Sequence, residues 1–389
     1  QQQRDCKLLS EEDSQRSMAR DSSTRRWFVL FRRGWVVVVV VVLGWLWPGL
    51  RLVLSRGWSS SSSSGIDDDD AASSSRSAPW PLVCALGAGI PYAVFVGFTD
   101  KLKRSARKVG PDWLAYGVRD VTTALLRDVL GVEWSMEVDE SAIRSFACVS
   151  PHGSYPLSSM FYALPSFRCD YPELEIRVGV ASVLFFVPLI REFLLLFGAR
   201  EVSKAAIEKL LSEGCAVGVN PGGVREMVLQ RSDKEVAYVQ QNLGVFRLAL
   251  KLKQPAIMLV YAFGENQRFT AHPDRLQTFR LWLAEKIRVG LPFISGRFGL
   301  CLGALPVLPH PGRCTHVVGT PVDLADLLDE KDLNEAAKVA YHRYAKALIA
   351  LFDTHKDRLL PPDVAEKGLD VIWIGHHDES YFSSEERRK

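Results

Sequence analysis

Two long stretches without a charged residue do most to constrain how this chain can fold. The first, Gly34–Leu50, has 17 residues and includes seven consecutive valines; the second, Pro79–Phe98, has 20 residues. Each is about long enough to span the hydrocarbon core of a bilayer. Membrane helices also tolerate the prolines and glycines of the second stretch. The two stretches therefore predict two membrane spans.

The charges around these stretches predict their orientation. Arginines precede the first stretch, lysines and arginines follow the second, and the connection is rich in serine and aspartate. By the positive-inside rule both outer flanks are cytosolic, so residues 34–98 are expected to form a membrane hairpin with a Ser/Asp-rich loop. A secretory signal peptide is the alternative for the first stretch, but its length and the lack of a small-residue cleavage site favour a retained span. Residues 1–33 are expected to be a disordered tail.

Composition excludes some classes of function. The net charge is only +3, which argues against a nucleic-acid partner. The seven cysteines form no C-x-x-C pair, which favours a reducing compartment. The P-loop, G-x-G-x-x-G, H-E-x-x-H and G-x-S-x-G patterns are absent. His376-His377-x-Glu379 resembles a metal cluster, but a polar tail is the simpler interpretation.

Strand-like and helix-like segments alternate from residue 110 onward, which predicts an α/β domain over residues 99–360. Residues 181–197 are strongly apolar and fit a buried helix or a helix in the membrane interface equally well. No element is predicted after Pro361, and residues 361–389 are expected to be a C-terminal tail. Strands are expected at 146–149, 215–219, 255–263 and 315–322, and helices at 111–129, 202–213 (capped by Ser203) and 334–352 (capped by Asn334).

The turn Ser150-Pro-His-Gly153 follows a predicted strand and carries the first candidate residue. Pro151 cannot donate a ladder hydrogen bond, so the strand ends there. Gly153 leaves room for a close ligand. His152 is then a candidate general base. From the residues alone, an ordinary turn histidine fits equally well.

A second turn, Pro221-Gly222-Gly223, also follows a predicted strand. Main-chain N–H groups in such a turn can hold an anion, although an ordinary glycine turn is the more common case. Arg225 adds a fixed positive charge suited to phosphate. Glu226, taken alone, is a first-turn helix carboxylate.

Several segments, taken in order, resemble the type-2 diacylglycerol acyltransferase family, which includes monoacylglycerol and wax-alcohol acyltransferases. Ser150-Pro-His-Gly153 resembles its His-Pro-His-Gly signature, and Gly222-Gly-Val-Arg-Glu226 its Gly-Gly-x-x-Glu block. Ser150 and Asn242 depart from the family pattern, which has His and Arg there. The other matching segments lie at 190–193, 202–203, 244–250, 261–266, 317–321 and 347–356.

The resemblance implies a glycerolipid-acyltransferase-like mixed sheet with flanking helices, preceded by the membrane hairpin. It also implies an acyl-CoA-dependent O-acyltransferase that forms triacylglycerol from diacylglycerol. His152 would take the proton of the acceptor hydroxyl as the oxygen attacks the thioester. Glu226 would orient His152, because Leu157 stands where distant relatives have an aspartate. The residues expected to bind substrate, including the oxyanion donors, are Pro151, Gly153, Pro221, Gly222, Gly223 and Arg225.

The expected partners are acyl-CoA, as co-substrate, together with diacylglycerol and the lipid bilayer; no cofactor, metal or nucleic acid is expected. The resemblance places the protein in the endoplasmic reticulum membrane with a cytosolic catalytic domain, and the lipid droplet is a second location. Monoacylglycerol and fatty alcohol stay open as acceptors. A non-catalytic lipid-droplet or membrane-anchored protein that keeps the fold also stays open, as do acyl-chain preference and homo-oligomerisation.

Overall fold

The computed structural model describes residues 92–156, 176–302 and 308–381, apart from positions 93, 98, 108, 125, 126, 129, 130, 139, 287 and 298. The chain divides into two compact units, residues 1–100 and 101–389. In the first unit the described residues before Asp100 are helical. The predicted tail and first span, and most of the second span, lie outside the described residues. Within the described part of the chain, no helix combines the length and apolarity needed to cross a membrane.

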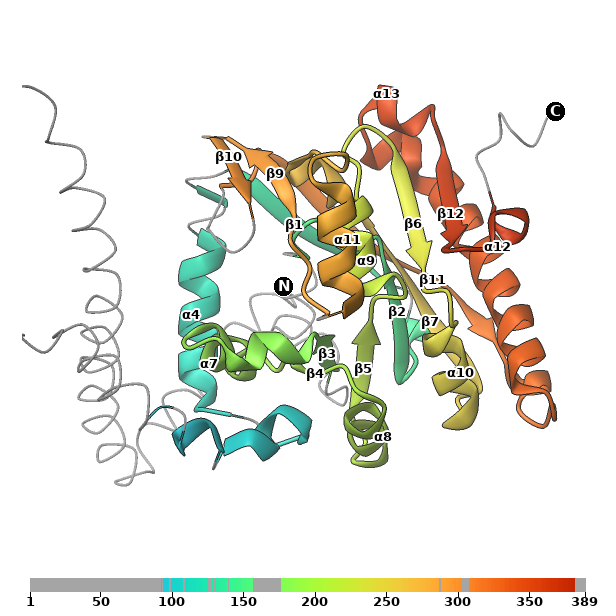
Figure 1. The fold of residues 1–389 in the computed structure, drawn as a ribbon, viewed down its shortest axis with the longest axis horizontal. Coiled ribbons are helices and arrows are strands. Elements are labelled where there is room, and N and C mark those ends of the chain that lie inside the picture. The colour runs from blue at the N-terminus through green and yellow to red at the C-terminus, as the bar shows by residue number, and fades with distance from the viewer. Residues whose placement is uncertain are drawn as a thin grey trace, which may run out of the picture. The chain divides into compact units, whose positions relative to one another are not determined.

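A seven-stranded mixed sheet forms the centre of the second unit (Figure 1), in the order β1-β11-β7-β2-β5-β3-β4. Strands β7, β2, β5, β3 and β4 run parallel, whereas β11 is antiparallel to β7 and β1 is parallel to β11. The predicted mixed sheet is therefore confirmed. Its strands are β1 Val132–Glu137, β2 Phe146–Ser150, β3 Ile176–Val180, β4 Arg200–Glu201, β5 Ala216–Val219, β7 Ala256–Phe263 and β11 Gly312–Asp323.

Two smaller sheets accompany the central one. A parallel pair joins β6 (Glu235–Val239) to β12 (Leu369–Trp373). An antiparallel set joins β8 (Thr270–Ala271), β9 (Phe293–Gly296) and β10 (Gly299–Leu302).

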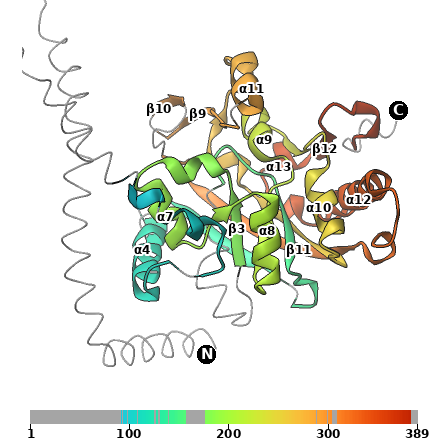
Figure 2. The ribbon, with the colours of Figure 1, turned by 60° about the horizontal axis from the view of Figure 1, so that its bottom comes forward.

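Helices flank the sheet, as predicted. Figures 1 and 2 show α10 beside α12, and the two helices contact each other. The α-helices are α4 Asp112–Ala124, α7 Ile190–Leu196, α8 Lys204–Ser212, α9 Gly223–Leu229, α10 Gly244–Lys251, α11 Gln277–Lys286, α12 Leu333–Leu359 and α13 Pro362–Ala365. Short 3₁₀ helices lie at Asp100–Arg104, Glu140–Ala142, Ser182–Phe186, Asn266–Arg268, Ala325–Leu327 and His377–Glu379.

Helix caps agree with the prediction at α8 and differ at α12. The Ser203 hydroxyl accepts a hydrogen bond from the Ala206 N–H, as expected for an N-cap. At α12 the predicted cap, Asn334, lies inside the helix. Asp332 is the N-cap, because its carboxylate accepts the main-chain N–H groups of Asn334 and Glu335.

Alternate residues of the central strands face two different cores. Phe146 and Cys148 of β2 belong to the larger core, which includes the buried face of α12. Ala147 and Val149 belong to a smaller cluster on the opposite face of the sheet. Both faces of β2 are therefore buried, as expected of a central parallel strand.

The apolar stretch at residues 181–197 is not one helix. A 3₁₀ helix, Ser182–Phe186, is followed by α7, and Leu189 between them has a φ of 68°. The break follows from Pro188, which cannot donate a helical hydrogen bond. Phe185 and Leu195 are buried, whereas Phe186 is exposed. The stretch thus combines a buried side with an exposed apolar side.

The chain after Pro361 forms structure that the sequence did not predict. Strand β12 pairs in parallel with β6, and its Leu369, Val371 and Trp373 side chains join the larger core. His376 stacks on Trp373 with ring centroids 4.1 Å apart. The interpretation of His376 as part of a polar tail is therefore wrong, because its ring packs on a core residue.

Candidate active site

Two turns meet at the carboxyl edge of the sheet. Strands β2 and β5 are parallel, with Cys148 opposite Val219, so the chain leaves both at the same edge. The turn with His152 follows β2, and the turn with Gly222 follows β5. The Asn220 Nδ2 atom donates to the Val149 carbonyl at 2.9 Å and ties the two strand ends together. Ligands of open α/β sheets commonly bind at this edge.

Glu226 links the two turns. It lies in the first turn of α9 with its side chain fully buried, and its Oε1 accepts the main-chain N–H of His152 at 3.0 Å. A Cβ atom at Gly222 would collide with Glu226 Oε2 and with the Tyr238 carbonyl. Gly222 therefore allows the carboxyl group to fold back against the start of its own helix.

The imidazole of His152 is positioned by a different group. Its Nδ1 lies 2.9 Å from the Gly153 carbonyl oxygen. When Nδ1 carries the proton and donates it to that carbonyl, Nε2 presents a lone pair. Nε2 makes no hydrogen bond to any residue that the structure describes. The expectation that Glu226 orients the ring needs correction, because Glu226 binds the amide of His152 and not its imidazole.

Gly153 is held in a backbone conformation that favours glycine. Its φ is +69°, and an added Cβ would lie 2.8 Å from Cγ of Glu265. The Gly153 N–H has no hydrogen-bond partner among the described residues. A main-chain donor next to a candidate base can stabilise a developing oxyanion.

Burial keeps both candidate catalytic groups uncharged near neutral pH. Burial raises the pKa of the Glu226 carboxyl to about 8, against the opposing effect of the His152 N–H. Burial also lowers the pKa of His152 below its usual value, while its hydrogen bond to Gly153 raises it. A neutral imidazole is the form required of a general base.

A contact with helix α12 also fixes the end of β2. The Ser150 hydroxyl lies 2.8 Å from the hydroxyl of Tyr344, and both groups are buried. Tyr344 belongs to α12, so this contact joins the long helix to the residue just before Pro151. Ser150 stands where the family usually has a histidine, and here it serves as a packing contact.

A second buried carboxylate, Glu235, was missed by sequence reasoning. Tyr261 and Asn266 donate to its Oε2 at 2.7 and 2.8 Å, and Gln267 donates to its Oε1 at 2.7 Å. Charge on Glu235 contributes to the raised pKa of Glu226. No local sequence pattern points to Glu235. The signal that could have found it is the 261–266 block, whose polar side chains need a hydrogen-bond partner when they are buried.

The predicted anion-binding turn is largely occupied by contacts of its own. The Gly223 N–H donates to the Asn220 carbonyl, and the Pro221 carbonyl accepts from the Gln240 N–H. Gln240 Nε2 donates to the Gly222 carbonyl at 2.6 Å. Gly223 is therefore corrected from a free oxyanion donor to a turn contact.

Arg225, the predicted phosphate ligand, has an acidic neighbour. One of its terminal nitrogens lies 3.4 Å from a carboxylate oxygen of Glu285 in α11. Its positive charge is thus shared with that carboxylate. Among the described residues, no group of three or more His, Cys, Asp or Glu side chains is arranged to hold a metal ion.

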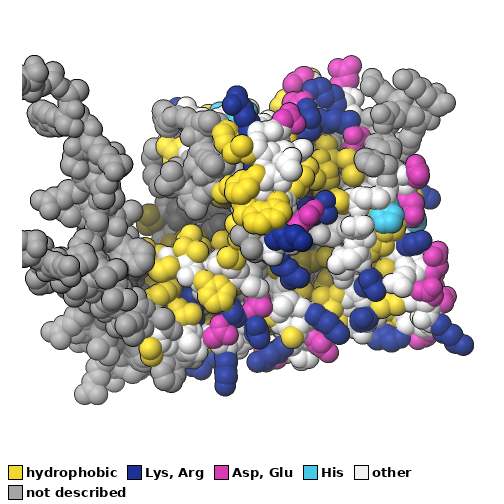
Figure 3. Space-filling view, in the orientation of Figure 1, with side chains coloured by type: hydrophobic (Ala, Val, Ile, Leu, Met, Phe, Trp, Pro, Cys, Tyr) yellow, Lys and Arg dark blue, Asp and Glu magenta, His cyan; other side chains and the backbone are white. Residues whose placement is uncertain are grey.

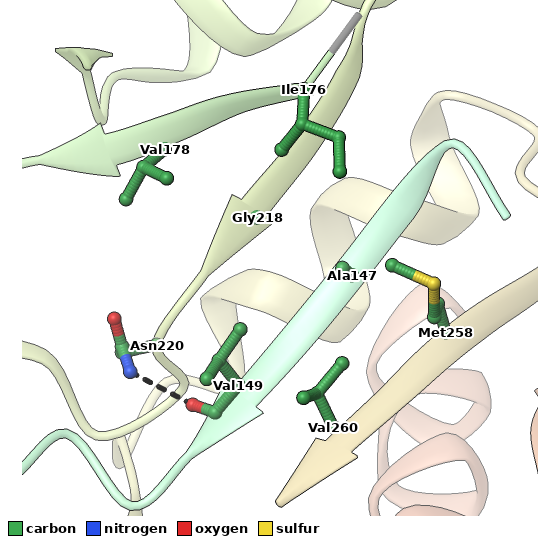
Figure 4. A pocket seen from close by; sticks show the side chains of 8 residues that line it. All are labelled: Ala147, Val149, Ile176, Val178, Gly218, Asn220, Met258 and Val260. Atoms are coloured by element: carbon green, nitrogen blue, oxygen red, sulfur yellow. Dashed lines mark hydrogen bonds between the residues drawn. The ribbon is translucent and has the colours of Figure 1, made fainter. Parts of the chain in front are cut away.

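A small apolar hollow lies on the sheet face below the site (Figure 4). It is lined by side chains from β2, β3, β5 and β7, with Asn220 at the end near the turns. Gly218 lies within it, buried in β5, and a Cβ placed there would meet no atom of the described residues within 4 Å. The other lining residues are Ala147, Val149, Ile176, Val178, Met258 and Val260.

An α/β sheet with a histidine and a buried carboxyl group at its carboxyl edge fits an enzyme that activates a hydroxyl nucleophile. The sequence profile described as diacylglycerol acyltransferase matches residues 137–366, more than half of the chain. The chain therefore belongs to the diacylglycerol acyltransferase family, in its type-2 branch. This confirms the resemblance drawn from the ordered segments.

Individual relatives support the same family. Diacylglycerol O-acyltransferase 2 of Dictyostelium discoideum is 28% identical over 286 residues, 70% of this chain and 83% of its own length. Diacylglycerol O-acyltransferase 2-like protein 6 of Homo sapiens is 31% identical over 50% of this chain and 60% of its own length. 2-Acylglycerol O-acyltransferase 3 of Homo sapiens is 30% identical over 48% of this chain and 56% of its own length.

The chain spans less than two thirds of the length of several relatives, including 64% of the mouse 2-like protein 6. No solved structure matches the chain.

Proposed function

We propose that this protein is an acyl-CoA-dependent O-acyltransferase that forms triacylglycerol from diacylglycerol. The observation that carries the proposal is the geometry around His152 in a chain of this family. Its amide is held by the buried Glu226, its Nδ1 contacts the Gly153 carbonyl, and its Nε2 is left without a described partner. This arrangement supports a general base with one nitrogen facing the substrate.

The proposed reaction needs one proton transfer in each direction. Nε2 of His152 accepts the proton of the acceptor hydroxyl while that oxygen attacks the thioester carbonyl carbon. The tetrahedral intermediate then collapses, the carbon–sulfur bond breaks, and the departing thiolate takes the proton back from the imidazolium. The Gly153 N–H is the proposed donor to the oxyanion. Glu226 positions the loop and does not touch the reacting atoms.

The apolar hollow supports a substrate with an aliphatic chain. It begins beside the turns that carry His152 and Glu226, and its lining is almost wholly hydrophobic. We place methylenes of the donor's acyl chain there, toward Gly218; the hollow is about 10 Å³ in volume, room for about one water molecule, so it must widen to admit them. Arg225, shared with Glu285, is the proposed contact for a phosphate of coenzyme A.

The proposed setting is the endoplasmic reticulum membrane, with residues 99–360 on its cytosolic side and the lipid droplet as a second location. A bilayer keeps diacylglycerol within reach while coenzyme A stays in water. The relatives' names include both diacylglycerol and 2-acylglycerol acceptors. Monoacylglycerol is therefore the second candidate acceptor.

The test is transfer of labelled acyl groups by membranes that contain the full chain. We expect His152→Ala to lower transfer to diacylglycerol about 10²–10⁴-fold, the usual contribution of a general base. The control is His355→Ala, which changes a histidine outside the site, on α12, and should keep activity. Wild-type membranes that consume no acyl-CoA with any acceptor would instead favour a non-catalytic protein. Full activity in His152→Ala would remove His152 from the mechanism.

A further inference from the structure

Helix α11 buries an arginine and exposes its aromatic residues. The Arg280 side chain is 1% exposed, and Leu276, Phe279 and Trp282 are 57%, 50% and 50% exposed. Figure 3 shows hydrophobic side chains gathered near the middle of one face, in the region that α11 occupies in Figure 1. Water-exposed helices normally show the reverse pattern.

The inverted pattern is built into the fold, because Arg280 is fixed by main-chain carbonyl groups. Its Nε donates to Leu291 at 2.6 Å, and Nη2 donates to Val228, in α9, at 3.1 Å. Nη1 donates to the carbonyls of His272, Pro273 and Arg275 at 3.1–3.2 Å. Rotating α11 to bury its aromatic residues would break these bonds and leave a cation unsatisfied, which is costly.

The exposed aromatic side chains form one continuous surface. The rings of Phe279 and Trp282 stack with centroids 6.1 Å apart. Burying side chains of this size is favourable, so leaving two of them half exposed to water forfeits a sizeable share of that stabilisation. Such a patch marks a contact with another apolar phase.

The charges around this surface indicate which phase. Arg275, Lys286 and Arg288 are exposed on α11 and beside it. Of the nearby acidic residues, Glu285 pairs with Arg225, and Asp274 lies before the helix. Aromatic residues mixed with basic ones are typical of a helix that lies in the headgroup layer of an anionic membrane.

We propose that α11 docks on an anionic lipid surface. Leu276, Phe279 and Trp282 enter the boundary between headgroups and acyl chains, and Arg275 and Lys286 contact lipid phosphates. We call these five residues the docking face.

The docking face is close to the candidate active site. Figures 1 and 2 show α11 beside α9, and the two helices are in contact. Helix α9 carries Glu226, and the Arg225–Glu285 pair crosses the helix interface. If the proposed function holds, docking would place the site at the membrane surface that contains its lipid substrate.

Photo-crosslinking of the full chain tests the proposal without requiring turnover. Benzoylphenylalanine is placed at position 282 or, as a matched control, at the exposed Ala350 of α12. Each protein is reconstituted in vesicles of phosphatidylcholine with phosphatidylserine, and the adducts are identified by mass spectrometry. We expect lipid adducts at position 282 and at least tenfold fewer at position 350.

A second experiment tests the role of the basic residues. The pair of changes Arg275→Gln and Lys286→Gln should lower the lipid adducts at position 282 several-fold in phosphatidylserine vesicles, and less in pure phosphatidylcholine. The proposal would be overturned if position 282 gave no lipid adducts, or gave adducts only to this chain or to a second copy of it. An inactive wild-type protein that still gives lipid adducts would refute the transferase and leave the docking face standing.

Discussion

At the scale of single residues, the candidate site depends on two groups that burial keeps neutral. Glu226 holds the His152 amide from a position with no exposure to solvent, and its pKa is raised to about 8. In the proposed mechanism, a carboxyl group kept protonated at neutral pH would hold the loop without placing a full negative charge beside the acyl thioester. If the proposed function holds, proton transfer would then be left to the His152 imidazole alone.

The raised pKa of Glu226 predicts a specific dependence of stability on pH. Between the ordinary carboxyl pKa and about 8, the folded protein keeps a proton that the unfolded chain releases. The contribution to stability is therefore complete at acid pH and lost as pH rises to about 8, by roughly tenfold in the folding equilibrium per pH unit. Glu226→Gln cannot ionise and keeps an acceptor oxygen, so its stability should fall less over this range.

The measurement is the thermal unfolding midpoint of both proteins in detergent from pH 5 to pH 8.5. The difference between them isolates this one group, since the other titrating groups are shared. Parallel curves would contradict a raised pKa at Glu226.

The lowered pKa of His152 predicts the acid limb of the activity profile. Protonation of Nε2 would remove the base, and burial shifts that event below the usual histidine pKa. We expect kcat/KM for acyl transfer to stay level as pH falls to 6.5 and to decline only below it. An acid limb centred above pH 7 would point to a different base.

At the scale of elements, β5 lies between β2 and β3 in the central sheet and borders the apolar hollow. Within the part of the chain that the structure describes, Gly218 has no steric need to be glycine, because its φ is not in the left-handed region and a Cβ there meets nothing within 4 Å. Gly218→Val should keep the fold and shorten the hollow. We expect transfer from long-chain acyl-CoA to fall roughly tenfold relative to short-chain acyl-CoA, the scale on which pockets discriminate between chain lengths.

Gly179→Val in the neighbouring β3 is the control for Gly218→Val. A Cβ at Gly179 would lie 3.1 Å from Val202 Cγ2 and 3.3 Å from the Gly218 carbonyl, so this change should lower the unfolding midpoint. The two variants are compared with a series of donors of increasing chain length. An equal loss with every donor in Gly218→Val would argue against an acyl chain in the hollow.

Local patterns predicted the elements whose signals are local. Strands β2, β5, β7 and β11 and helices α4, α8 and α12 formed at the predicted places, although the cap of α12 is Asp332 and this helix continues to Leu359. Residues 181–197 were expected to form one helix, and the break at Pro188 was not predicted. Helix α11 was not predicted, since its buried arginine and exposed aromatic residues invert the pattern on which such predictions depend.

At the scale of the whole molecule, the C-terminal segment completes the core. Strand β12 pairs with β6 across more than a hundred residues of sequence, and Trp373 packs on Tyr341 of α12. We expect Trp373→Ala to cost about 3–5 kcal/mol of unfolding free energy, as for other large buried side chains. The exposed Asp378→Ala should change stability little.

Thermal unfolding of these two variants in detergent compares them directly. Equal midpoints for Trp373→Ala and Asp378→Ala would show that β12 contributes little to the core.

The sequence predicted only part of the site, because several of its contacts join segments that are far apart in the chain. The sequence placed His152 and Glu226 after neighbouring strands, because parallel strands bring such turns to one edge. It could not show that Glu226 binds an amide, since every residue offers the same N–H. The Glu235 network and the Arg225–Glu285 pair also depend on segments far apart in the chain.

The contact between Glu226 and the main chain of residue 152 makes loop structure and catalysis separable. The hydrogen bond would survive any substitution of His152 that keeps the backbone, because the side chain is not involved. If the proposed function holds, one mutation at position 152 would silence a duplicated copy of this gene without disturbing its fold. Such a copy would retain whatever the scaffold binds, which offers a direct route from an acyltransferase to a lipid-associated protein without activity.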